Sequence, residues 1–361
     1  MVYRSNVGLD VHARSIKAAV FIPETGEVIE RGFAYDADAL AAWIEKLPSP
    51  AGCVYESGPT GFDLARRLQG HGIECTIGAV SKMLRPAGDR VKTDRRDALF
   101  LARMLAVGNI VEVAIPTCEL EAARDLSRAR ADARADLMRA RHLLSKFLLR
   151  KGIVYEAGKS TWTKTHKRWL SSFSFEYADE QLVFEQYLDG IIHFEQRRDR
   201  LGRAIETRAA SPEFASIVNA LKCLRGIGTV TAFSIAAEIG DFTRFANARS
   251  FMSYLGLVPS ENSTGESISR GKITRTGNIH VRTLLVESAW HHRRIYRPLT
   301  TAATIDGAAA GITVCSIAQK ANRRLYRRYH DLALRGKRPN TINIAIAREL
   351  AGFIWAIANS V

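Results

Sequence analysis

Short apolar runs alternate with helical periodicities along the first hundred residues. Apolar, β-rich runs occupy residues 6–12, 16–23, 27–35, 52–56 and 74–80, and helical patterns occupy residues 38–47 and 62–70. The Glu24-Thr25-Gly26 turn predicts a hairpin that pairs the second and third strands antiparallel. Strands that alternate with helices predict an α/β fold class for a first domain, which we place at residues 1–114.

Long helical periodicities replace this alternation from Thr93 onward. Residues 94–107 predict one helix with Thr93 or Asp94 as its N-cap. Residues 117–151 and 181–207 predict two longer helices, each with an apolar stripe and a charged outer face. We expect these two helices to form a coiled-coil-like arm over residues 115–208 that contacts a second protomer or nucleic acid. A plain helical bundle is the alternative.

The remaining residues, 209–361, predict a mostly helical C-terminal domain. A turn at Gly226-Ile227-Gly228 separates two helical patterns and resembles a helix-hairpin-helix segment. In such a segment the glycines, Gly226 and Gly228, allow close backbone approach, and the next helix offers its N-terminal amides to a phosphate. A helix corner with purely structural glycines is the alternative. Residues 313–361 are predicted to be helical, and their basic cluster includes Arg323 and Arg324.

The charge balance of the chain indicates the kind of partner it binds. Lys and Arg number 52 and Asp and Glu number 37, for a net charge of +15 over 361 residues. An excess of this size favours a polyanionic partner, most often nucleic acid, over a merely soluble basic protein. Five scattered cysteines without a CxxC pair support neither zinc nor disulfides, and they fit a reducing cytoplasm. No membrane span and no signal peptide are expected from the pattern of apolar residues.

Four carboxylates occupy positions that local structure alone does not favour. Asp10 interrupts an apolar strand, Glu56 ends another, and Asp94 and Asp97 share one face of a helix by their i, i+3 spacing. A buried charge is costly unless it is paired or binds metal. Four hard oxygen donors suit Mg²⁺ or Mn²⁺, and two such ions can clamp the attacking and leaving oxygens of a phosphodiester. For the helix pair alone, a cap and a solvated side chain are the alternative.

Cations and hydroxyls surround two candidate sites. Lys92, Arg95 and Arg96 flank the helix carboxylates and are candidates for phosphate contacts. A glycine-punctuated segment near residue 265 carries the hydroxyls of Ser260, Ser263, Thr264, Ser267 and Ser269. Its cations are Arg270, Lys272, Arg275 and Arg282. A hydroxyl that attacks a phosphodiester needs such cationic neighbours, although a basic loop that binds the DNA backbone has the same composition. Spacing alone selects no serine.

The order Asp10, Glu56, Asp94, Asp97, together with the GIG turn and the block GLVPSENSTGE…GKITRTGNIHVRTLL, resembles the DEDD-type transposases of the IS-one-ten insertion-sequence family. The resemblance covers nearly the whole chain. It implies a RuvC-like, RNase H-like N-terminal domain that uses Mg²⁺, and a C-terminal transposase domain whose serine forms a covalent phosphoserine link to DNA. It also implies a structured noncoding bridge or seeker RNA that pairs with donor and target DNA. The family's dimers join into a tetramer with a composite site, in the bacterial cytoplasm near the nucleoid.

Two neighbouring residues, Ser263 and Thr264, are candidates for the nucleophile. The family serine usually stands directly before a glycine, where this chain has Thr264, with Ser263 one residue earlier. We predict Ser263 as the nucleophile because a primary hydroxyl is less hindered than a branched one, and Thr264 is the alternative. Competing functions are a RuvC-like resolvase or nuclease that uses water, and a non-catalytic nucleic-acid scaffold. Histidines that could be general bases or surface residues are His12, His280, His291 and His292.

Overall fold

The computed structural model describes residues 3–79, 93–158, 160–264, 267, 269–296 and 311–361. The chain divides into two compact units, Met1–Thr117 and Cys118–Val361, each of which is described by itself. The first unit contains the predicted α/β domain. The predicted arm lies within the second unit, so the boundary near residue 208 stays a prediction.

A mixed five-stranded sheet forms the centre of the first unit. Its strands are β1 (Ser5–Val11), β2 (Ser15–Ile22), β3 (Glu27–Ala34), β4 (Ala51–Glu56) and β5 (Glu74–Gly78). The strand order is β3-β2-β1-β4-β5, with β1, β2 and β3 antiparallel and with β4 and β5 parallel to β1. The predicted hairpin between β2 and β3 is confirmed, and Gly26 supplies the positive φ of +72° in its turn.

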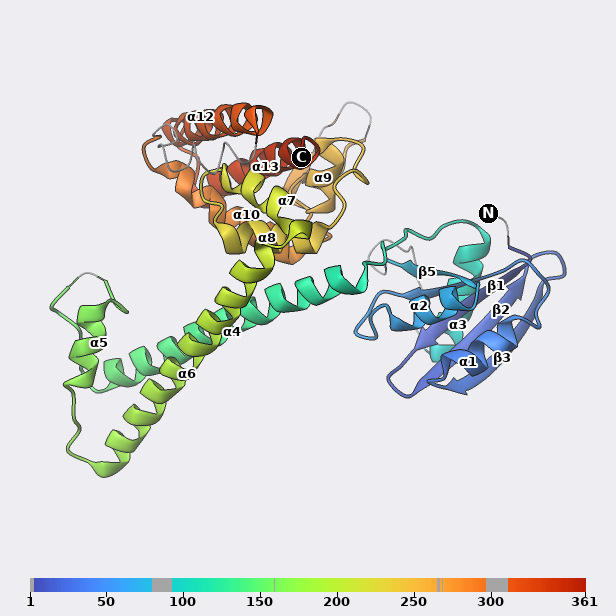
Figure 1. Ribbon diagram of the computed structural model, residues 1–361, viewed down its shortest axis with the longest axis horizontal. Helices are drawn as coiled ribbons and strands as arrows, with labels where there is room; N and C mark the ends of the chain where they lie inside the picture. The colour runs from blue at the N-terminus through green and yellow to red at the C-terminus, as the bar shows by residue number, and fades with distance from the viewer. Residues whose placement is uncertain (1–2, 80–92, 159, 265–266, 268, 297–310) are drawn as a thin grey trace. The chain divides into compact units, whose positions relative to one another are not determined.

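Helices cover both faces of this sheet (Figure 1). The helices are α1 (Ala37–Ile44), α2 (Asp63–Gly70) and α3 (Asp94–Ala106). One face buries Val7 and Leu9 of β1 with the apolar sides of α1 and α2, while α3 packs against β1 and β2. Thr93 is the N-cap of α3, because its Oγ1 accepts from the Arg96 amide at 3.4 Å. This mixed sheet is consistent with the expected RuvC-like domain.

Two long helices form the predicted arm of the second unit (Figure 1). They are α4 (Cys118–Arg150) and α6 (Ala178–Ala209), which run antiparallel and contact each other. The apolar stripe of α4 is confirmed, since Ala133, Leu137 and Leu144 are all buried. A short helix, α5 (Lys164–Ser171), lies between them and was not expected; Leu170 packs with Phe184 of α6 in the core of the arm.

The rest of the second unit is a helical body that carries one small hairpin. Its elements are α7 (Pro212–Lys222), α8 (Thr229–Ile239), α9 (Ala248–Tyr254), β6 (Pro259–Glu261), β7 (Arg270–Ile273), α10 (Ile279–Ala289), the 3₁₀ turn η2 (Trp290–Arg293), α12 (Ile312–Leu334) and α13 (Pro339–Ala358). The region predicted as helical after residue 313 is two helices. Proline has no amide hydrogen and suits the first turn of a helix, so Pro339 begins α13 instead of continuing α12.

Among the described residues, α13 is long and apolar enough to cross a membrane by length and composition. This finding qualifies the expectation that no segment would meet that test. Eight residues of α13 are nevertheless buried within the second unit, among them Ile346, Leu350 and Ile354. A core helix of this kind meets the same test, because burial inside a protein and burial in lipid favour the same residues.

Candidate functional site

A glycine allows the helix of the two aspartates to lie against the first strand. Gly8 and Asp10 are two residues apart on β1 and therefore share the sheet face that α3 covers. A Cβ at Gly8 would lie 1.9 Å from the carbonyl oxygen of Ala98 and 2.5 Å from the amide nitrogen of Ala102. Ala98 follows Asp94 by one helical turn, so this close contact brings the first turn of α3 towards Asp10.

Three side chains meet at the end of β1. The Nε2 atom of His12 lies 3.2 Å from an oxygen of Asp10 and 3.5 Å from an oxygen of Asp94. One ligand atom from each of the three residues lies within 4.8 Å of the other two. Two carboxylates and one imidazole at this spacing have the chemistry to hold a divalent cation.

The electrostatics of Asp10 support the same use. Partial burial raises the pKa of the Asp10 carboxyl above its ordinary value, His12 lowers it, and the charges of Asp94 and Asp97 raise it again. The net shift is upward, first because partial burial disfavours the ionised form and second because the nearby carboxylate charges repel it. A cation between these carboxylates would remove that penalty, so the residues present fit a divalent metal.

The other two predicted ligands occupy the same region of the first unit. The parallel register sets Leu9 beside Tyr55, so Asp10 and Glu56 follow at the ends of neighbouring strands. Asp97 is half-buried in the first turn of α3 and acts electrostatically on Asp10. The group with ligand atoms within 4.8 Å contains neither Glu56 nor Asp97. Asp10 and Asp94 are therefore brought together directly, with Glu56 and Asp97 beside them.

The sequence left His12 as a general base or a surface residue and did not place it with the carboxylates, although its spacing carried a signal. In Asp10-Val11-His12 the outer two residues share one side of an extended chain, which places the imidazole beside the carboxylate. The alternative of a surface residue is wrong for His292, which is fully buried. Burial, followed by the charges of Arg225 and His291, lowers the pKa of His292 to about 4.

An open hollow of about 640 Å³ lies beside the first turn of α3. Its lining consists of Lys17, Ala18, Glu30, Arg31, Gly32, Thr93, Asp94 and Arg95. Lys17 stands opposite Asp10 in the β1–β2 register and is exposed, so it is a further cation for a phosphate near the carboxylates. Of the predicted phosphate contacts, Arg95 forms an ion pair with Glu30, Arg96 is exposed, and Lys92 lies outside the described residues.

A β-hairpin presents the predicted nucleophile in the second unit. Ser263 Oγ donates a hydrogen bond to Glu261 Oε1 at 3.0 Å. The Asn262 amide donates to the Ser269 carbonyl at 2.9 Å, and Thr264 and Ser267 exchange backbone hydrogen bonds of 3.1 Å. Ser263 therefore lies between two hydrogen-bonded pairs of the hairpin, with its hydroxyl against a carboxylate.

The four cations predicted around this serine differ in their surroundings. Arg270 lies opposite Glu261 and forms an ion pair with it at 3.5 Å, while Lys272 and Arg275 are exposed. Arg282 is only 8% exposed and donates to the carbonyl oxygens of Leu255 at 2.8 Å and Thr276 at 2.9 Å. Burial, followed by the charge of Arg275, lowers its pKa. These contacts indicate that Arg282 supports the loop between α9 and α10, not a phosphate.

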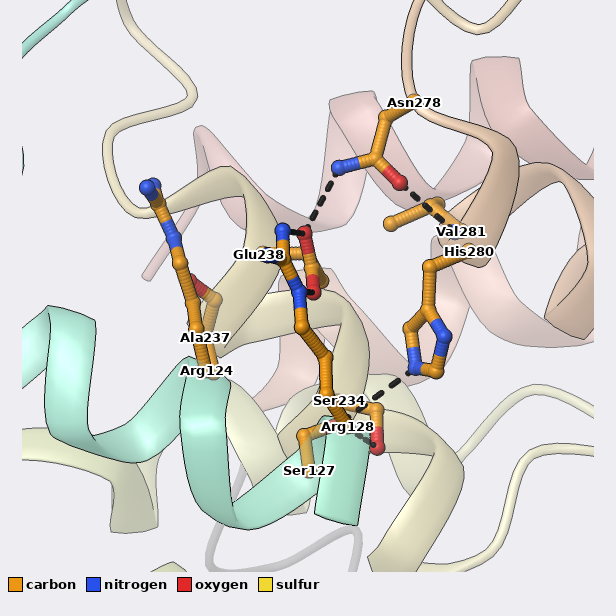
Figure 2. Close-up of polar contacts among 9 residues, drawn as sticks. All are labelled: Arg124, Ser127, Arg128, Ser234, Ala237, Glu238, Asn278, His280 and Val281. Atoms are coloured by element: carbon orange, nitrogen blue, oxygen red, sulfur yellow. Dashed lines mark hydrogen bonds and ion pairs between the residues drawn. The ribbon is translucent and has the colours of Figure 1, made fainter. Parts of the chain in front are cut away.

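A polar network around the buried carboxylate of Glu238 ties α4 to α8 and to the start of α10 (Figure 2). Arg128 of α4 donates two hydrogen bonds, of 2.7 and 3.0 Å, to the carboxylate of Glu238 in α8. Asn278 donates to the same carboxylate at 2.8 Å while it caps α10 by accepting from the Val281 amide at 2.9 Å. Burial raises the pKa of Glu238, but the bonds from Arg128 and Asn278 outweigh this, and the net pKa is lowered.

A second group of hydrogen bonds lies beside this carboxylate (Figure 2). Ser127 of α4 donates to Ser234 of α8 at 2.7 Å, and its oxygen lies 3.4 Å from Nε2 of His280. His280 sits in the first turn of α10, two residues after Asn278. Both groups hold the helix that follows the serine hairpin against the arm.

The GIG turn has one packing residue and one exposed residue. Gly226 has a φ of +85°, and a Cβ there would lie 2.6 Å from the Ser288 carbonyl oxygen. This contact indicates the structural alternative for Gly226, because only glycine permits it. Gly228 is exposed and is the N-cap of α8, which leaves the nucleic-acid hypothesis open at that helix end.

The basic cluster near the end of the chain lines a hollow on α12. Its volume is about 580 Å³, and its lining consists of Ser316, Gln319, Lys320, Arg323, Arg324, Arg327, Arg328 and Asp331. Arg324 pairs with Glu349 of α13 at 2.8 Å, and Arg323 is exposed. Repeated cations on one helix face are suited to the phosphates of a nucleic acid.

Comparison with known proteins identifies the family of this chain. A family model for the DEDD transposases of IS110 matches residues 7–152, and the model described as Transposase IS116/IS110/IS902 family matches residues 218–303. Over 98% of its length the chain is 37% identical to y4qE, a transposase-like protein of Sinorhizobium fredii, of which the match covers 88%. Over 92% of its length it is 31% identical to the transposase of insertion sequence element IS1533 from Leptospira borgpetersenii, of which it covers 97%. The chain therefore belongs to the IS110 family of transposases, as its sequence resemblance implied.

Proposed function

We propose that this transposase cuts and rejoins DNA strands through a covalent 5′-phosphoserine at Ser263, with help from a divalent cation at the carboxylates. The observation that carries the proposal is the convergence of Asp10 and Asp94 at the end of β1, in a family whose members are transposases. The family is typically dependent on a divalent metal, and the four carboxylates carry the oxygen donors that such a metal prefers. The hydrogen bond between Ser263 and Glu261 supports the choice of this serine.

Asp10, Glu56, Asp94 and Asp97 would hold Mg²⁺ or Mn²⁺ in this proposal. When bound, the cation supplies positive charge to a phosphodiester as negative charge develops on its oxygens. Lys17 beside Asp10 would add a fixed positive charge for the same phosphate. His12 would orient the Asp10 and Asp94 carboxylates through the contacts it makes with both.

Ser263 would attack the phosphorus and displace a 3′-hydroxyl, and the 3′-hydroxyl of the exchanged strand would reverse the step. Arg270, Lys272 and Arg275 would bind the DNA phosphates beside the hairpin. Transesterification retains the phosphodiester energy in the phosphoserine bond, so no nucleotide triphosphate is needed. The chain accordingly has no GxxxxGK[ST] motif.

A structured guide RNA and further copies of the chain complete the proposal. The cation-lined hollow on α12 supports RNA or DNA binding. A second hollow on α6 is lined by His193, Gln196, Arg197, Arg200 and Arg203, and it has the same character. The arm would contact a second protomer, and dimers would join as a tetramer in which one protomer's carboxylates and another's serine form a composite site.

A covalent-trapping assay tests the chemistry. The protein, its element-encoded RNA and a nicked donor-junction DNA are mixed with Mg²⁺ and separated on a denaturing gel. We expect a protein–DNA adduct that is absent in Ser263→Ala and in Asp10→Asn but present in the hairpin control Ser269→Ala. An adduct that survives Ser263→Ala and disappears in Thr264→Ala would move the nucleophile by one residue. Cleavage without an adduct would indicate a hydrolytic nuclease instead.

A binding measurement tests the metal independently of activity. Titration of Mn²⁺ into the protein, followed by the electron paramagnetic resonance signal of the free ion, should show a site that Asp10→Asn weakens at least about tenfold. Asp63→Asn is the matched control, because Asp63 is an exposed aspartate of the same unit that pairs with Arg67 at 3.0 Å. Equal Mn²⁺ binding by the Asp10→Asn variant and the wild type would contradict the proposed ligand set.

A further inference from the structure

A serine hydroxyl is a weak nucleophile until a base takes its proton, and the hairpin places a carboxylate where that proton is. We infer that Glu261 accepts the proton of Ser263 as the serine attacks DNA, which makes Glu261 a catalytic residue; the inference rests on the proposed function. Ser263 Oγ already donates to Glu261 Oε1 at 3.0 Å, within the distance that proton transfer requires. No other element has to move for the two groups to meet.

The backbone of the hairpin maintains this contact. Residues two apart along an extended chain point to the same side, so Glu261 and Ser263 share one side of the hairpin. The pairs Asn262–Ser269 and Thr264–Ser267 close the hairpin on either side of Ser263. By the same alternation Thr264 points to the side opposite Glu261. A nucleophile at Thr264 would lack this proton acceptor, which favours Ser263.

Arg270 orients the carboxylate for this role. It lies directly opposite Glu261 in the β6–β7 register, and its Nε is 3.5 Å from Glu261 Oε2. The second oxygen, Oε1, faces the hydroxyl. Each carboxylate oxygen therefore has a separate partner, as in catalytic sites where a base is itself held by a third group. The other charged side chain on this strand of the hairpin is Lys272, which is exposed.

The step balances within the named groups. As the bond between Ser263 Oγ and phosphorus forms, the hydroxyl proton passes to Glu261, and the bond between phosphorus and the 3′-oxygen breaks. The departing 3′-oxygen keeps the electron pair and takes a proton from water. In the rejoining step an incoming 3′-hydroxyl gives its proton back to water as its oxygen bonds to phosphorus, and it displaces Ser263, which recovers its proton from Glu261. The same carboxyl group thus acts as base in cleavage and as acid in rejoining.

The rate of adduct formation in the full-length protein with its RNA tests the inference. Glu261→Gln keeps a hydrogen-bond acceptor for the hydroxyl but cannot take its proton, so the rate should fall about 10²–10⁴-fold while DNA binding stays within about twofold. Formate should partly restore the rate of Glu261→Ala, because a small carboxylate can occupy the vacated space. Glu287→Gln is the matched control, since Glu287 is an exposed glutamate that pairs with Arg134 at 3.1 Å.

The outcomes separate this inference from the function on which it rests. An adduct in Ser263→Ala would refute the proposed nucleophile, whatever Glu261 does. Loss of the adduct in Ser263→Ala together with a wild-type rate in Glu261→Gln would refute the proton acceptor alone. A slow Glu261→Gln variant without formate rescue of Glu261→Ala would assign Glu261 a positioning role and would also overturn the inference.

Discussion

Two clusters of charged groups in this molecule have opposite surroundings. In the first unit, Asp10 faces Asp94 and Asp97 with His12 between the first two, and its pKa is raised. In the second unit, Glu238 is 2% exposed and accepts bonds from Arg128 and Asn278, and its pKa is lowered. Both carboxylates are partly or fully removed from water, but Glu238 accepts hydrogen bonds from Arg128 and Asn278, whereas Asp10 has His12 as a partner and two further carboxylates nearby.

The contrast separates a site for a ligand from a structural contact. Carboxylates that repel each other reduce stability unless something outside the chain compensates, and a divalent cation is the chemistry that fits. A carboxylate that is fully bonded to arginine and asparagine gains nothing from a further ligand. Glu238 connects the arm to the helix after the serine hairpin, whereas the Asp10 group has the chemistry of the metal site that we propose.

The largest expected effect comes from Asp10→Asn. Strand cleavage should fall at least about 1000-fold, which corresponds to about 4 kcal/mol of transition-state stabilisation. Metal-free thermal stability should not decrease, because the substitution removes a charge that partial burial and the nearby carboxylates disfavour. Melting curves and cleavage rates of the same preparation check both statements, with Asp63→Asn as the control. A large loss of metal-free stability would place Asp10 in the same structural class as Glu238.

Disrupting the Glu238 cluster should lower the free energy of unfolding and not primarily the cleavage rate. Arg128→Ala leaves the buried Glu238 carboxylate without its main partner, and because Arg128 itself is half-exposed and Asn278 still donates, we expect the free energy of unfolding to fall by about 1–3 kcal/mol. Denaturant unfolding of the full chain measures it. Arg134→Ala on the same helix is the control, because its pair with Glu287 is half-exposed and should contribute less than about 1 kcal/mol. Similar losses in the two variants would mean that burial of Glu238 adds little.

Gly8→Ala tests the contact that forms the Asp10 cluster. The added Cβ meets the Ala98 carbonyl oxygen at 1.9 Å, so α3 must shift, at a cost of about 1–3 kcal/mol and with weaker Mn²⁺ binding. Gly70→Ala is the control, since a Cβ there meets nothing within 4 Å. Unchanged Mn²⁺ affinity in Gly8→Ala would show that the metal site tolerates a displaced α3.

Acid should produce the smallest effect and should act on Glu238. Because its folded pKa lies below the ordinary value of 4.5, its contribution is fully present above pH 4.5 and is lost as pH falls through the folded pKa. The stability difference between wild type and Glu238→Gln, about 1–2 kcal/mol at neutral pH, should therefore shrink in acid. Hydrogen exchange of α8 amides at several pH values measures it. A difference that grows in acid would reverse the assigned sign.

Much of the fold was predictable because local patterns agreed with it. The β2–β3 hairpin, the helix that Thr93 caps and the buried stripe of α4 each follow from periodicity or from a capping residue. Helix α5 and the β6–β7 hairpin were not predicted. Both are short, and neither has enough residues for a period to appear, so contacts with distant segments stabilise them.

The family, the basic charge and the four acidic positions follow from the residue types and their order, because these properties need no fold. Which side chains meet depends on the folded chain. It brought His12 between Asp10 and Asp94, buried Arg282 among backbone carbonyls, and set Glu261 against Ser263. These contacts depend on strand register, on the close approach at Gly8 and on the hairpin. Such features arise from packing between segments that lie far apart in the chain.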